Sequence, residues 1–242
     1  MDLNVGHQAA GFASDLAGKR AVVIGAGYGV GPEVVAALRQ AGVQVVVDAA
    51  DLDGSVHVED DGDVFGFLDR CEQNLGGIDI LVLSSRPVKN KPVMDMTPEE
   101  MRAVAEAEMV QPALQMQEAA RRMSRAGYGR IIVFASMSAK TGVHHNVAPY
   151  AAAKGGLLAF ARVLAAETAE HGVTVNGIAT ALFEPQVKTM TEGKRNSLRG
   201  GIPVGRFGRS EEAAHAVLFL ASANAGFVTG ECLNLSGGRF MD

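Results

Sequence analysis

A short apolar run followed at once by four glycines constrains this chain more than any other feature. The segment RAVVIGAGYGVGPEVVAALRQAG has consecutive apolar residues at 21–24, glycines at 25, 27, 29 and 31, and a helical pattern after Pro32. An unbroken apolar run of this length predicts a strand that is buried on both faces, as in a parallel sheet. A strand that leads through a glycine-rich turn into a helix predicts the first unit of a doubly wound α/β fold.

The same alternation continues to the end of the chain. Further strands are predicted in VQVVVD, SVHV, IDILVLSS, GRIIVFAS, VTVNGIA and GECLNLSGG. Between them, helices are predicted in VFGFLDRCEQNLGG, the long stretch from Thr97 to Gly127, APYAAAKGGLLAFARVLAAETAEHG and SEEAAHAVLFLAS. This order predicts one Rossmann-like domain at 17–242, with about seven parallel strands and helices on both faces. Residues 1–16 are expected to form a loose tail.

Composition excludes several classes of function. A net charge of -5 with no basic stripe argues against a nucleic-acid or anionic-membrane partner. The two cysteines, Cys71 and Cys232, have neither metal-ligand spacing nor a disulfide framework. The chain starts without a signal-peptide pattern and has no apolar run of about 18 residues. We therefore expect a cytoplasmic protein without a metal site.

The glycine turn is a candidate site for the pyrophosphate of a dinucleotide. Missing side chains allow close approach, and the N–H groups and dipole of the following helix attract an anion. The predicted cofactor contacts in this turn are Gly25, Gly27, Gly29, Val30 and Gly31.

Asp48 ends the next predicted strand and extends this cofactor site. A carboxylate about twenty positions after the glycine turn binds the ribose 2′-hydroxyl and repels a 2′-phosphate. The sequence therefore favours NAD over NADP.

A tyrosine and a lysine four residues apart form a second candidate site. In APYAAAKGG, Pro149 suits the first position of a helix, so Tyr150 and Lys154 share one face of its first turns. An ammonium beside a phenol lowers the pKa of the phenol, which then exchanges a proton near neutral pH. Ser136 ends the strand RIIVFAS, at the edge of the sheet where the glycine turn also lies. The spacing alone is more typical of an amphipathic surface helix, but the serine and the glycine turn favour a catalytic site.

On these segments, the whole chain resembles the short-chain dehydrogenase/reductase family. The resemblance runs from AGKRAVVIGAGYGVG through DILVLSS, GRIIVFASMSA, YAAAK, GVTVNGIA and GRFGRSEEAAHAVLFLAS to TGECLNLSGG. It implies a doubly wound parallel sheet, a nicotinamide cofactor and assembly that is commonly tetrameric. It also implies that Tyr150 is the general acid/base and that Ser136 positions the carbonyl or hydroxyl. Lys154 would contact the nicotinamide ribose and lower the pKa of the tyrosine.

Three segments depart from the pattern of that family. The usual Asn-Asn-Ala-Gly after the fourth strand is Leu-Ser-Ser-Arg at 83–86, where Ser84 is still a candidate cofactor contact. The usual Pro-Gly after the sixth strand is Thr180 and Ala181. The stretch 49–63 is too short for the usual crossover helix, which needs about a dozen residues with its loops. We therefore expect a divergent cofactor pocket, open on one side of the adenine site.

Glu108 is the sharpest departure and a candidate catalytic residue. It aligns with the family's catalytic Asn, whose main-chain carbonyl lies at a helix irregularity and holds a water of the proton relay. Pro112 follows four residues later, and proline cannot donate a hydrogen bond to the carbonyl of residue i−4. We therefore predict an irregular helix with the carbonyl of Glu108 free for the relay. The alternative is that Pro112 only kinks the helix and that the relay is lost.

A second likeness is to the halohydrin dehalogenases, a cofactor-free lyase branch related to the family. It rests on AEAEMVQP and on the lost Asn-Asn-Ala-Gly. Those proteins carry arginine at the position of Lys154 and a bulky aromatic at that of Gly29, whereas Tyr28 is one residue early. Both positions favour a dehydrogenase.

The remaining candidates lie in loops near the predicted site. His144 and His145 are either substrate contacts or plain loop residues. The stretch 182–204 stands where the resemblance places a mobile substrate lid, with Phe183 and Met190 as apolar contacts.

We therefore predict an NAD-dependent oxidoreductase that interconverts a secondary alcohol and a ketone. We expect a small-molecule substrate and a homotetramer or homodimer. Two alternatives are a dehalogenase-like lyase with Tyr150 as its base, and a catalytically impaired member that serves as a binding partner.

Overall fold

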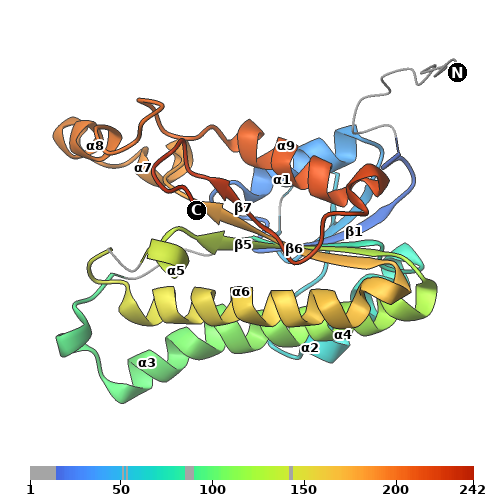
Figure 1. Ribbon diagram of the computed structural model, residues 1–242. Coiled ribbons are helices and arrows are strands. Elements are labelled where there is room, and N and C mark those ends of the chain that lie inside the picture. Colours follow the sequence, from blue (N-terminus) through green and yellow to red (C-terminus); the bar gives the residue numbers. More distant parts are fainter. Residues whose placement is uncertain (1–14, 51, 53, 85–89, 142–143) are drawn as a thin grey trace, which may run out of the picture.

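The computed structural model describes residues 15–50, 52, 54–84, 90–141 and 144–242 of the chain. Seven parallel strands form one sheet in the order β3-β2-β1-β4-β5-β6-β7. Helices cover both faces of the sheet (Figure 1), with α1 and α9 on one side and α2, α4 and α6 on the other. The predicted doubly wound parallel sheet is confirmed, including the number of its strands.

The strands begin and end close to the predicted positions. They are β1 (Arg20–Ile24), β2 (Gln44–Val47), β3 (Val56–His57), β4 (Ile80–Leu83), β5 (Gly129–Ser136), β6 (Val173–Thr180) and β7 (Cys232–Leu235). The α-helices are α1 (Gly31–Gln40), α2 (Val64–Leu75), α3 (Pro98–Ala105), α4 (Gln111–Ala126), α5 (Ser138–Thr141), α6 (Ala148–Thr168), α7 (Glu184–Val187), α8 (Glu192–Arg199) and α9 (Ser210–Ala221). Short 3₁₀ turns lie at η1 (Val93–Asp95), η3 (Ala169–His171) and η4 (Ala223–Ala225), and η2 (Glu106–Val110) is a π-helical turn.

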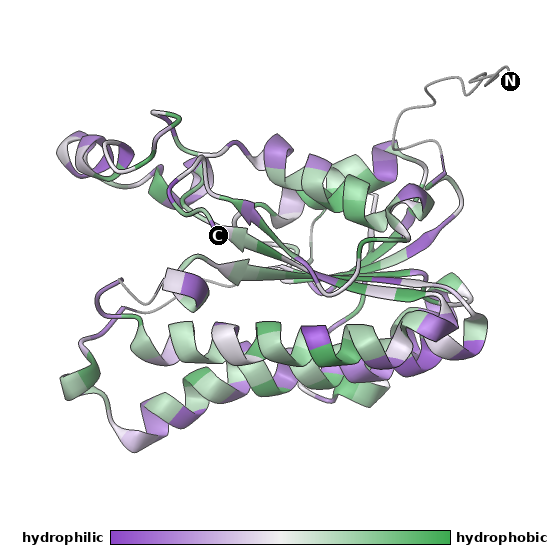
Figure 2. Cartoon of the chain, in the orientation of Figure 1, coloured by the Kyte–Doolittle hydropathy of each residue, from purple (hydrophilic) through white to green (hydrophobic). Residues whose placement is uncertain are grey.

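The hydrophobic core has two halves, one on each face of the sheet. Successive side chains of a strand point to opposite faces, so Val22 packs under α2, α4 and α6 while Val23 packs under α1 and α9. Figure 2 shows hydrophobic colours along the strands and on the helix sides that meet them. The unbroken apolar runs of the sequence follow directly from this burial on both faces.

Local signals set the start of the long helical segment under the sheet. Thr97 accepts a hydrogen bond from the backbone N–H of Glu100, and the Glu100 carboxylate accepts one from the backbone of Thr97. This capping box satisfies two N–H groups that the helix itself leaves unpaired, and Pro98 needs no donor at its position. The predicted start of the helix is therefore confirmed.

The structure shows where the N-terminal tail ends and how β2 is connected to β3. Leu16 is fully buried in the core, and the carboxylate of Asp15 accepts a hydrogen bond of 2.9 Å from the hydroxyl of Ser222. The expected tail therefore ends before Asp15, because burial of Leu16 holds this end of the chain against the domain; residues 1–14 lie outside the described residues. In the described part of the connection from β2 to β3, no crossover helix forms, as its length predicts.

Two searches of the described residues found nothing. None of their helices is both long and apolar enough to cross a membrane. No three His, Cys, Asp or Glu side chains among them are grouped so as to hold a metal ion.

Two phenylalanines of α2 provide a test of the core. Phe67 is fully buried beneath the sheet, whereas Phe65 is 48% exposed on the same helix. Replacing Phe67 with alanine should lower the free energy of unfolding by about 3–5 kcal/mol, because it leaves a cavity in a packed core. The matched change Phe65→Ala should cost less than about 1 kcal/mol. Urea unfolding measures both, and equal losses would contradict this packing.

Candidate active site

The largest cavity described lies at the carboxyl ends of the strands. It has a volume of about 620 Å³ and reaches from the glycine turn to the predicted lid. Its lining includes Tyr28, Gly29, Val30, Ser136, His144, His145, Tyr150, Thr180, Phe183 and Met190. In Figure 1 the lid helices α7 and α8 project beyond the sheet on the side of α5. One cavity therefore joins the two sites that the sequence predicts separately.

Tyr150 stands at the start of α6, where Pro149 occupies the first turn. The tyrosine is 9% exposed, so only its edge reaches the cavity. Ser136 ends β5 nearby, and its hydroxyl accepts a hydrogen bond of 2.8 Å from the hydroxyl of Ser138. The backbone N–H of Ser138 also donates to it, at 3.2 Å. Two donors from the next turn thus fix the hydroxyl of Ser136 at the strand end.

Lys154 lies one turn further along α6 and is 3% exposed. Its Nζ is 3.0 Å from Oε2 of Glu108, and the side chain of Glu108 is itself only 12% exposed. The same Nζ is 5.8 Å from the centre of the Tyr150 ring. A buried ammonium needs a negative partner, because its loss of hydration is otherwise uncompensated. Glu108, at the position of the family's Asn, supplies that partner.

The acidity of Tyr150 differs from the prediction made from sequence. We expected Lys154 to lower the pKa of the phenol, but the pKa is raised well above its usual range. Burial is the main cause, and the negative charge of Glu108 adds to it, while a hydrogen bond with Ser136 acts in the opposite direction. Burial of the phenol and the nearby charge of Glu108 together explain the difference from the prediction.

The helix that carries Glu108 is irregular at this residue. The π-helical turn η2 separates α3 from α4, and the N–H of Gln111 donates to the carbonyl of Glu106, five residues back. The predicted irregularity is confirmed; a free carbonyl at Glu108 stays a prediction. The turn η2 packs against α6, where a side chain in place of Gly156 would meet the sulfur of Met109 at 3.2 Å. The glycine thus lets the helix with Glu108 approach the helix with Lys154.

A smaller cavity of about 150 Å³ lies behind this ion pair. It is lined by Ser84, Glu108, Lys154 and Gln115, and it reaches Asp60 and Gly62 beyond β3. The hydroxyl of Ser84 is buried without a partner within the described structure. Because a buried water needs two to four polar partners, this cavity has the polar lining that ordered water requires. Ser84 therefore does not line the cavity around Tyr150, and Ser85 and Arg86 lie outside the described residues.

The glycine turn has the conformation that a pyrophosphate site requires. Gly25 and Gly29 adopt positive φ angles of 76° and 57°. A Cβ at Gly31 would stand 2.5 Å from the carbonyl oxygen of Ala26, so only glycine fits there. No side chain caps the start of α1, so the positive end of its helix dipole faces the glycine turn. The N–H of Gly31 donates to the carbonyl of Tyr28 at 2.8 Å, and Pro32 has no N–H, so the first two positions of α1 offer an anion no free N–H group.

Asp48 binds the turn directly. Its carboxylate accepts hydrogen bonds from the N–H groups of Gly25, at 2.8 Å, and Ala26, at 3.0 Å. These two bonds fix the carboxylate of Asp48 against the start of the glycine turn. Together with the glycine turn, this geometry fits a dinucleotide.

Two basic residues that sequence analysis missed also line the large cavity. Lys194 belongs to α8, and Arg239 follows β7 near the end of the chain. In the sequence, only its position after a strand end marked Arg239 as a candidate site residue. Lys194 lies in a polar stretch that has no pattern typical of a binding site. The two candidate histidines do reach the cavity: Nδ1 of His144 is 3.2 Å from the hydroxyl of Thr141, and His145 is exposed at the rim.

Comparisons with known proteins agree with this architecture. A family model described as Enoyl-(Acyl carrier protein) reductase matches residues 24–239. The 3-oxoacyl-[acyl-carrier-protein] reductase FabG of Escherichia coli K12 is 31% identical over 93% of this chain and 98% of its own. FabG of Vibrio cholerae is 32% identical over 94% and 99%. A short-chain type dehydrogenase/reductase from Mycobacterium marinum superposes with a TM-score of 0.86 at 31% identity, covering 95% of this chain and 98% of the other.

The fold and the glycine turn define a Rossmann-like α/β protein of the dinucleotide-binding class. Within that class, the chain belongs to the short-chain dehydrogenase/reductase family of oxidoreductases, which use a nicotinamide cofactor. The likeness to halohydrin dehalogenases gains no support from these relatives.

The ion pair of Lys154 makes a prediction about Tyr150. Replacing Glu108 with glutamine should lower the pKa of Tyr150, because it removes a negative charge that favours the neutral phenol. Tyrosinate absorbance during alkaline titration, with the Tyr150→Phe protein subtracted, measures this pKa. The matched change Glu106→Gln removes the same charge from an exposed position on η2 and should leave the titration unchanged. An identical titration in the Glu108→Gln and wild-type proteins would contradict the pairing.

Proposed function

We propose that this protein is an NAD-dependent oxidoreductase that interconverts a secondary alcohol and a ketone. The observation that carries the proposal is the single cavity that joins the glycine turn to Ser136 and Tyr150. A nicotinamide cofactor held by that turn would accept or supply the hydride. The relatives named 3-oxoacyl-[acyl-carrier-protein] reductase make a 3-oxoacyl thioester one ketone to test.

Tyr150 is the proposed acid/base at the substrate oxygen. The hydroxyl of Ser136 would bind the same oxygen and hold it beside the phenol. The raised pKa keeps Tyr150 protonated at neutral pH, so it would act there as a proton donor. Reduction of a ketone needs that donor, because the carbonyl oxygen becomes a hydroxyl.

Lys154 and Glu108 are the proposed supports of this proton transfer. Lys154 would contact the nicotinamide ribose, and Glu108 would hold the ammonium in position through their 3.0 Å contact. The smaller cavity behind them extends to Asp60 and is a path along which water could return a proton. In this proposal the carboxylate of Glu108 and its main-chain carbonyl both face the relay.

Asp48 supports the preference for NAD. Its carboxylate is fixed against the glycine turn by two backbone N–H groups. A 2′-phosphate at this position would meet a like charge, whereas a 2′-hydroxyl would find an acceptor. Cofactor contacts from Gly25, Gly27, Gly29, Val30 and Gly31 are part of the same proposal.

The remaining expectations are also proposals. We infer a cytoplasmic location, a homotetramer or homodimer, and a lid at 182–204 that closes over the substrate. Light scattering on the purified protein tests the assembly, and limited proteolysis with and without NADH tests closure of the lid.

Removal of the Tyr150 hydroxyl tests the catalytic role. The Tyr150→Phe protein should lose about 10²–10⁴-fold in kcat, because general acid/base catalysis contributes about that much. NADH binding, followed by fluorescence, should stay within about twofold of wild type. Tyr128→Phe is the matched control, since the Tyr128 hydroxyl has no partner within the described structure and lies at the opposite end of β5. Retained turnover in Tyr150→Phe would reject the assignment.

Removal of the Asp48 charge tests the choice of cofactor. The Asp48→Asn protein should shift the ratio of kcat/KM values for NAD and NADP about tenfold toward NADP, because the repulsion of the 2′-phosphate is lost. Asp95→Asn removes the same charge from an exposed position on η1 and should not change the ratio. A wild-type protein that prefers NADP would overturn the assignment of Asp48.

A further inference from the structure

The lining of the large cavity carries positive charge that no carboxylate of the described lining compensates. Lys194 of α8 and Arg239 after β7 both line it, together with His144 and His145. None of the described residues that line this cavity is an aspartate or a glutamate. A substrate that enters therefore meets two permanent cations and no carboxylate of the described protein.

Three arginines around the lid are already neutralised or stacked. Arg195 pairs with Glu184 at 3.1 Å, and Arg206 pairs with Glu212 at 2.6 Å. Arg199 lies over the ring of Phe207, 5.8 Å from its centre.

Lys194 and Arg239 differ from those neighbours. Within the part of the chain that the structure describes, neither side chain makes an ion pair or a hydrogen bond. Arg239 is also partly buried, so part of its hydration is lost without a protein partner in return. An unpaired arginine at the wall of a cavity is ready to bind an anion.

The backbone holds Arg239 in this position. Gly237 and Gly238 turn the chain with φ angles of 61° and 81°, and the N–H of Arg239 donates to the carbonyl of Ser236 at 3.2 Å. The guanidinium lies at the base of the lid, because a Cβ on Gly201 would be 3.9 Å from its Cζ. Arg239 is therefore placed by a turn of the fold rather than by a flexible terminus.

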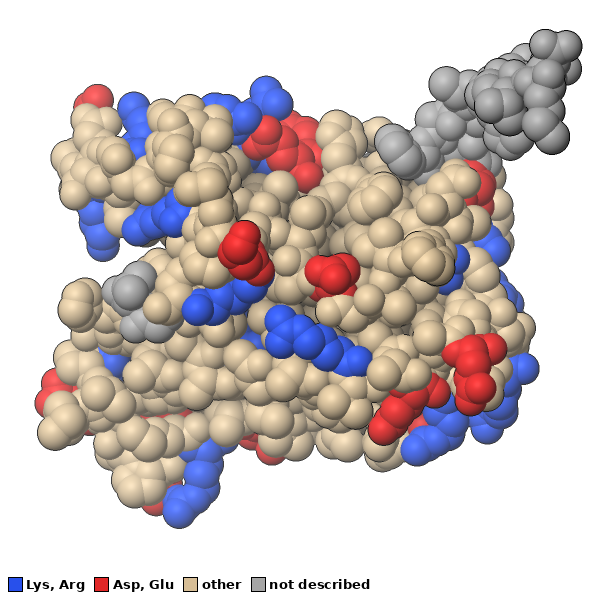
Figure 3. All heavy atoms as spheres, in the orientation of Figure 1, with Lys and Arg blue, Asp and Glu red and all other residues tan. Residues whose placement is uncertain are grey.

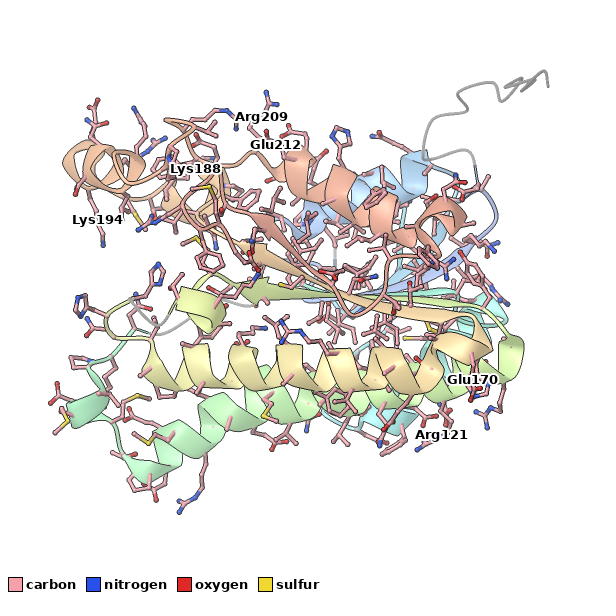
Figure 4. The ribbon with its side chains drawn as sticks, viewed as in Figure 1. Arg121, Glu170, Lys188, Lys194, Arg209 and Glu212 are labelled. Atoms are coloured by element: carbon pink, nitrogen blue, oxygen red, sulfur yellow. The ribbon has the colours of Figure 1, made fainter. Side chains whose placement is uncertain are left out.

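The positive charge of Arg239 also affects His144, which lines the same cavity. The pKa of His144 is lowered, first by burial and then by the positive charge of Arg239. Figure 4 shows Lys194 extending from α8 on the side of the lid that faces α5, and Figure 3 shows basic side chains on this underside, over the hollow. Cationic groups thus approach one space from the lid and from the C-terminal segment.

We propose that the substrate carries an anionic group, a carboxylate or a phosphate, which Arg239 and Lys194 bind while Ser136 and Tyr150 hold the reacting oxygen. The inference rests on the proposed oxidoreductase function and adds the charge of its substrate. A guanidinium binds two oxygens of a carboxylate or phosphate with its planar donors, and an ammonium adds a point charge. The lid would then close over the anion, because Lys194 moves with α8.

Substrate pairs of matched shape test this inference. Reduction of levulinate is compared with that of methyl levulinate, and reduction of dihydroxyacetone phosphate with that of dihydroxyacetone, each with NADH. Oxo acids of other lengths, such as 3-oxohexanoate, vary the distance between the anionic group and the ketone carbonyl. The acid with the highest kcat/KM then indicates the distance that the site prefers. The anionic member of at least one pair should have a kcat/KM about tenfold or more above its neutral partner. Preference for the acid or for the phosphate identifies the anion.

Variants of the lid and of the C-terminal segment locate the site. Arg239→Met and Lys194→Met should each reduce the advantage of the anionic member about tenfold while leaving the neutral member within about twofold. Lys188→Met is the matched control, because Lys188 is an exposed lysine of the lid that does not line the cavity. NADH affinity should be unchanged in all three proteins. A loss of NADH affinity with unchanged preference would assign the two cations to the cofactor and overturn the inference.

Direct binding separates this inference from the proposed function. Calorimetric titration of levulinate and dihydroxyacetone phosphate into the wild-type and Arg239→Met proteins needs no turnover. Binding that depends on Arg239, without reduction of any ketone, would support the anion site and reject the oxidoreductase. Reduction of neutral ketones with equal kcat/KM for their anionic partners would support the oxidoreductase and reject the anion site.

Discussion

Parallel pairing of the strands is the constraint on which the site depends. The pairing of β5 with β6 runs without a break from Gly129 opposite Val173 to Ser136 opposite Thr180. Because every strand runs in the same direction, all of their carboxyl ends meet at one edge of the sheet. The glycine turn, Asp48 and Ser136 each follow a different strand and still face the same region. The direction of the strands therefore places these groups at one edge of the sheet, whatever the conformation of the longer loops.

The burial of the Lys154 ammonium affects the protonation of Tyr150 through Glu108. The buried ammonium demands a counter-charge, which Glu108 supplies from the π-helical turn η2. The same carboxylate favours the neutral form of Tyr150 and so offsets the effect that a lone lysine would have. Glu108 therefore is the ion-pair partner of the lysine and also raises the proton affinity of the tyrosine. A phenol of this kind is protonated at neutral pH.

The charge of the large cavity complements this arrangement. Ser136 and Tyr150 line this cavity at the end of β5 and at the start of α6, whereas Lys194 and Arg239 line it from α8 and from the segment after β7. Separation of these two pairs along one cavity would fix both the orientation of a substrate and its reacting carbon. Specificity would then come from segments that lie outside the sheet, as is usual when loops on a rigid scaffold carry function.

Four features could be predicted from the sequence: about seven strands, the glycine turn, the start of the long helix at Thr97, and the placement of Tyr150 and Lys154 on one helix face. These features depend on local signals: apolar runs, helix caps and the spacing of four residues that aligns side chains on a helix. The irregularity near Glu108 was also predictable, because the effect of Pro112 on its own helix is local.

The contacts between different elements depend on how those elements pack in three dimensions. Glu108 contacts Lys154 because η2 packs on α6 at a glycine, and the raised pKa of Tyr150 follows from that contact and from burial. Lys194 and Arg239 share a cavity because a turn after β7 brings Arg239 close to Gly201, just after α8. No periodicity in the sequence encodes such contacts, since they depend on the packing of segments that are far apart along the chain.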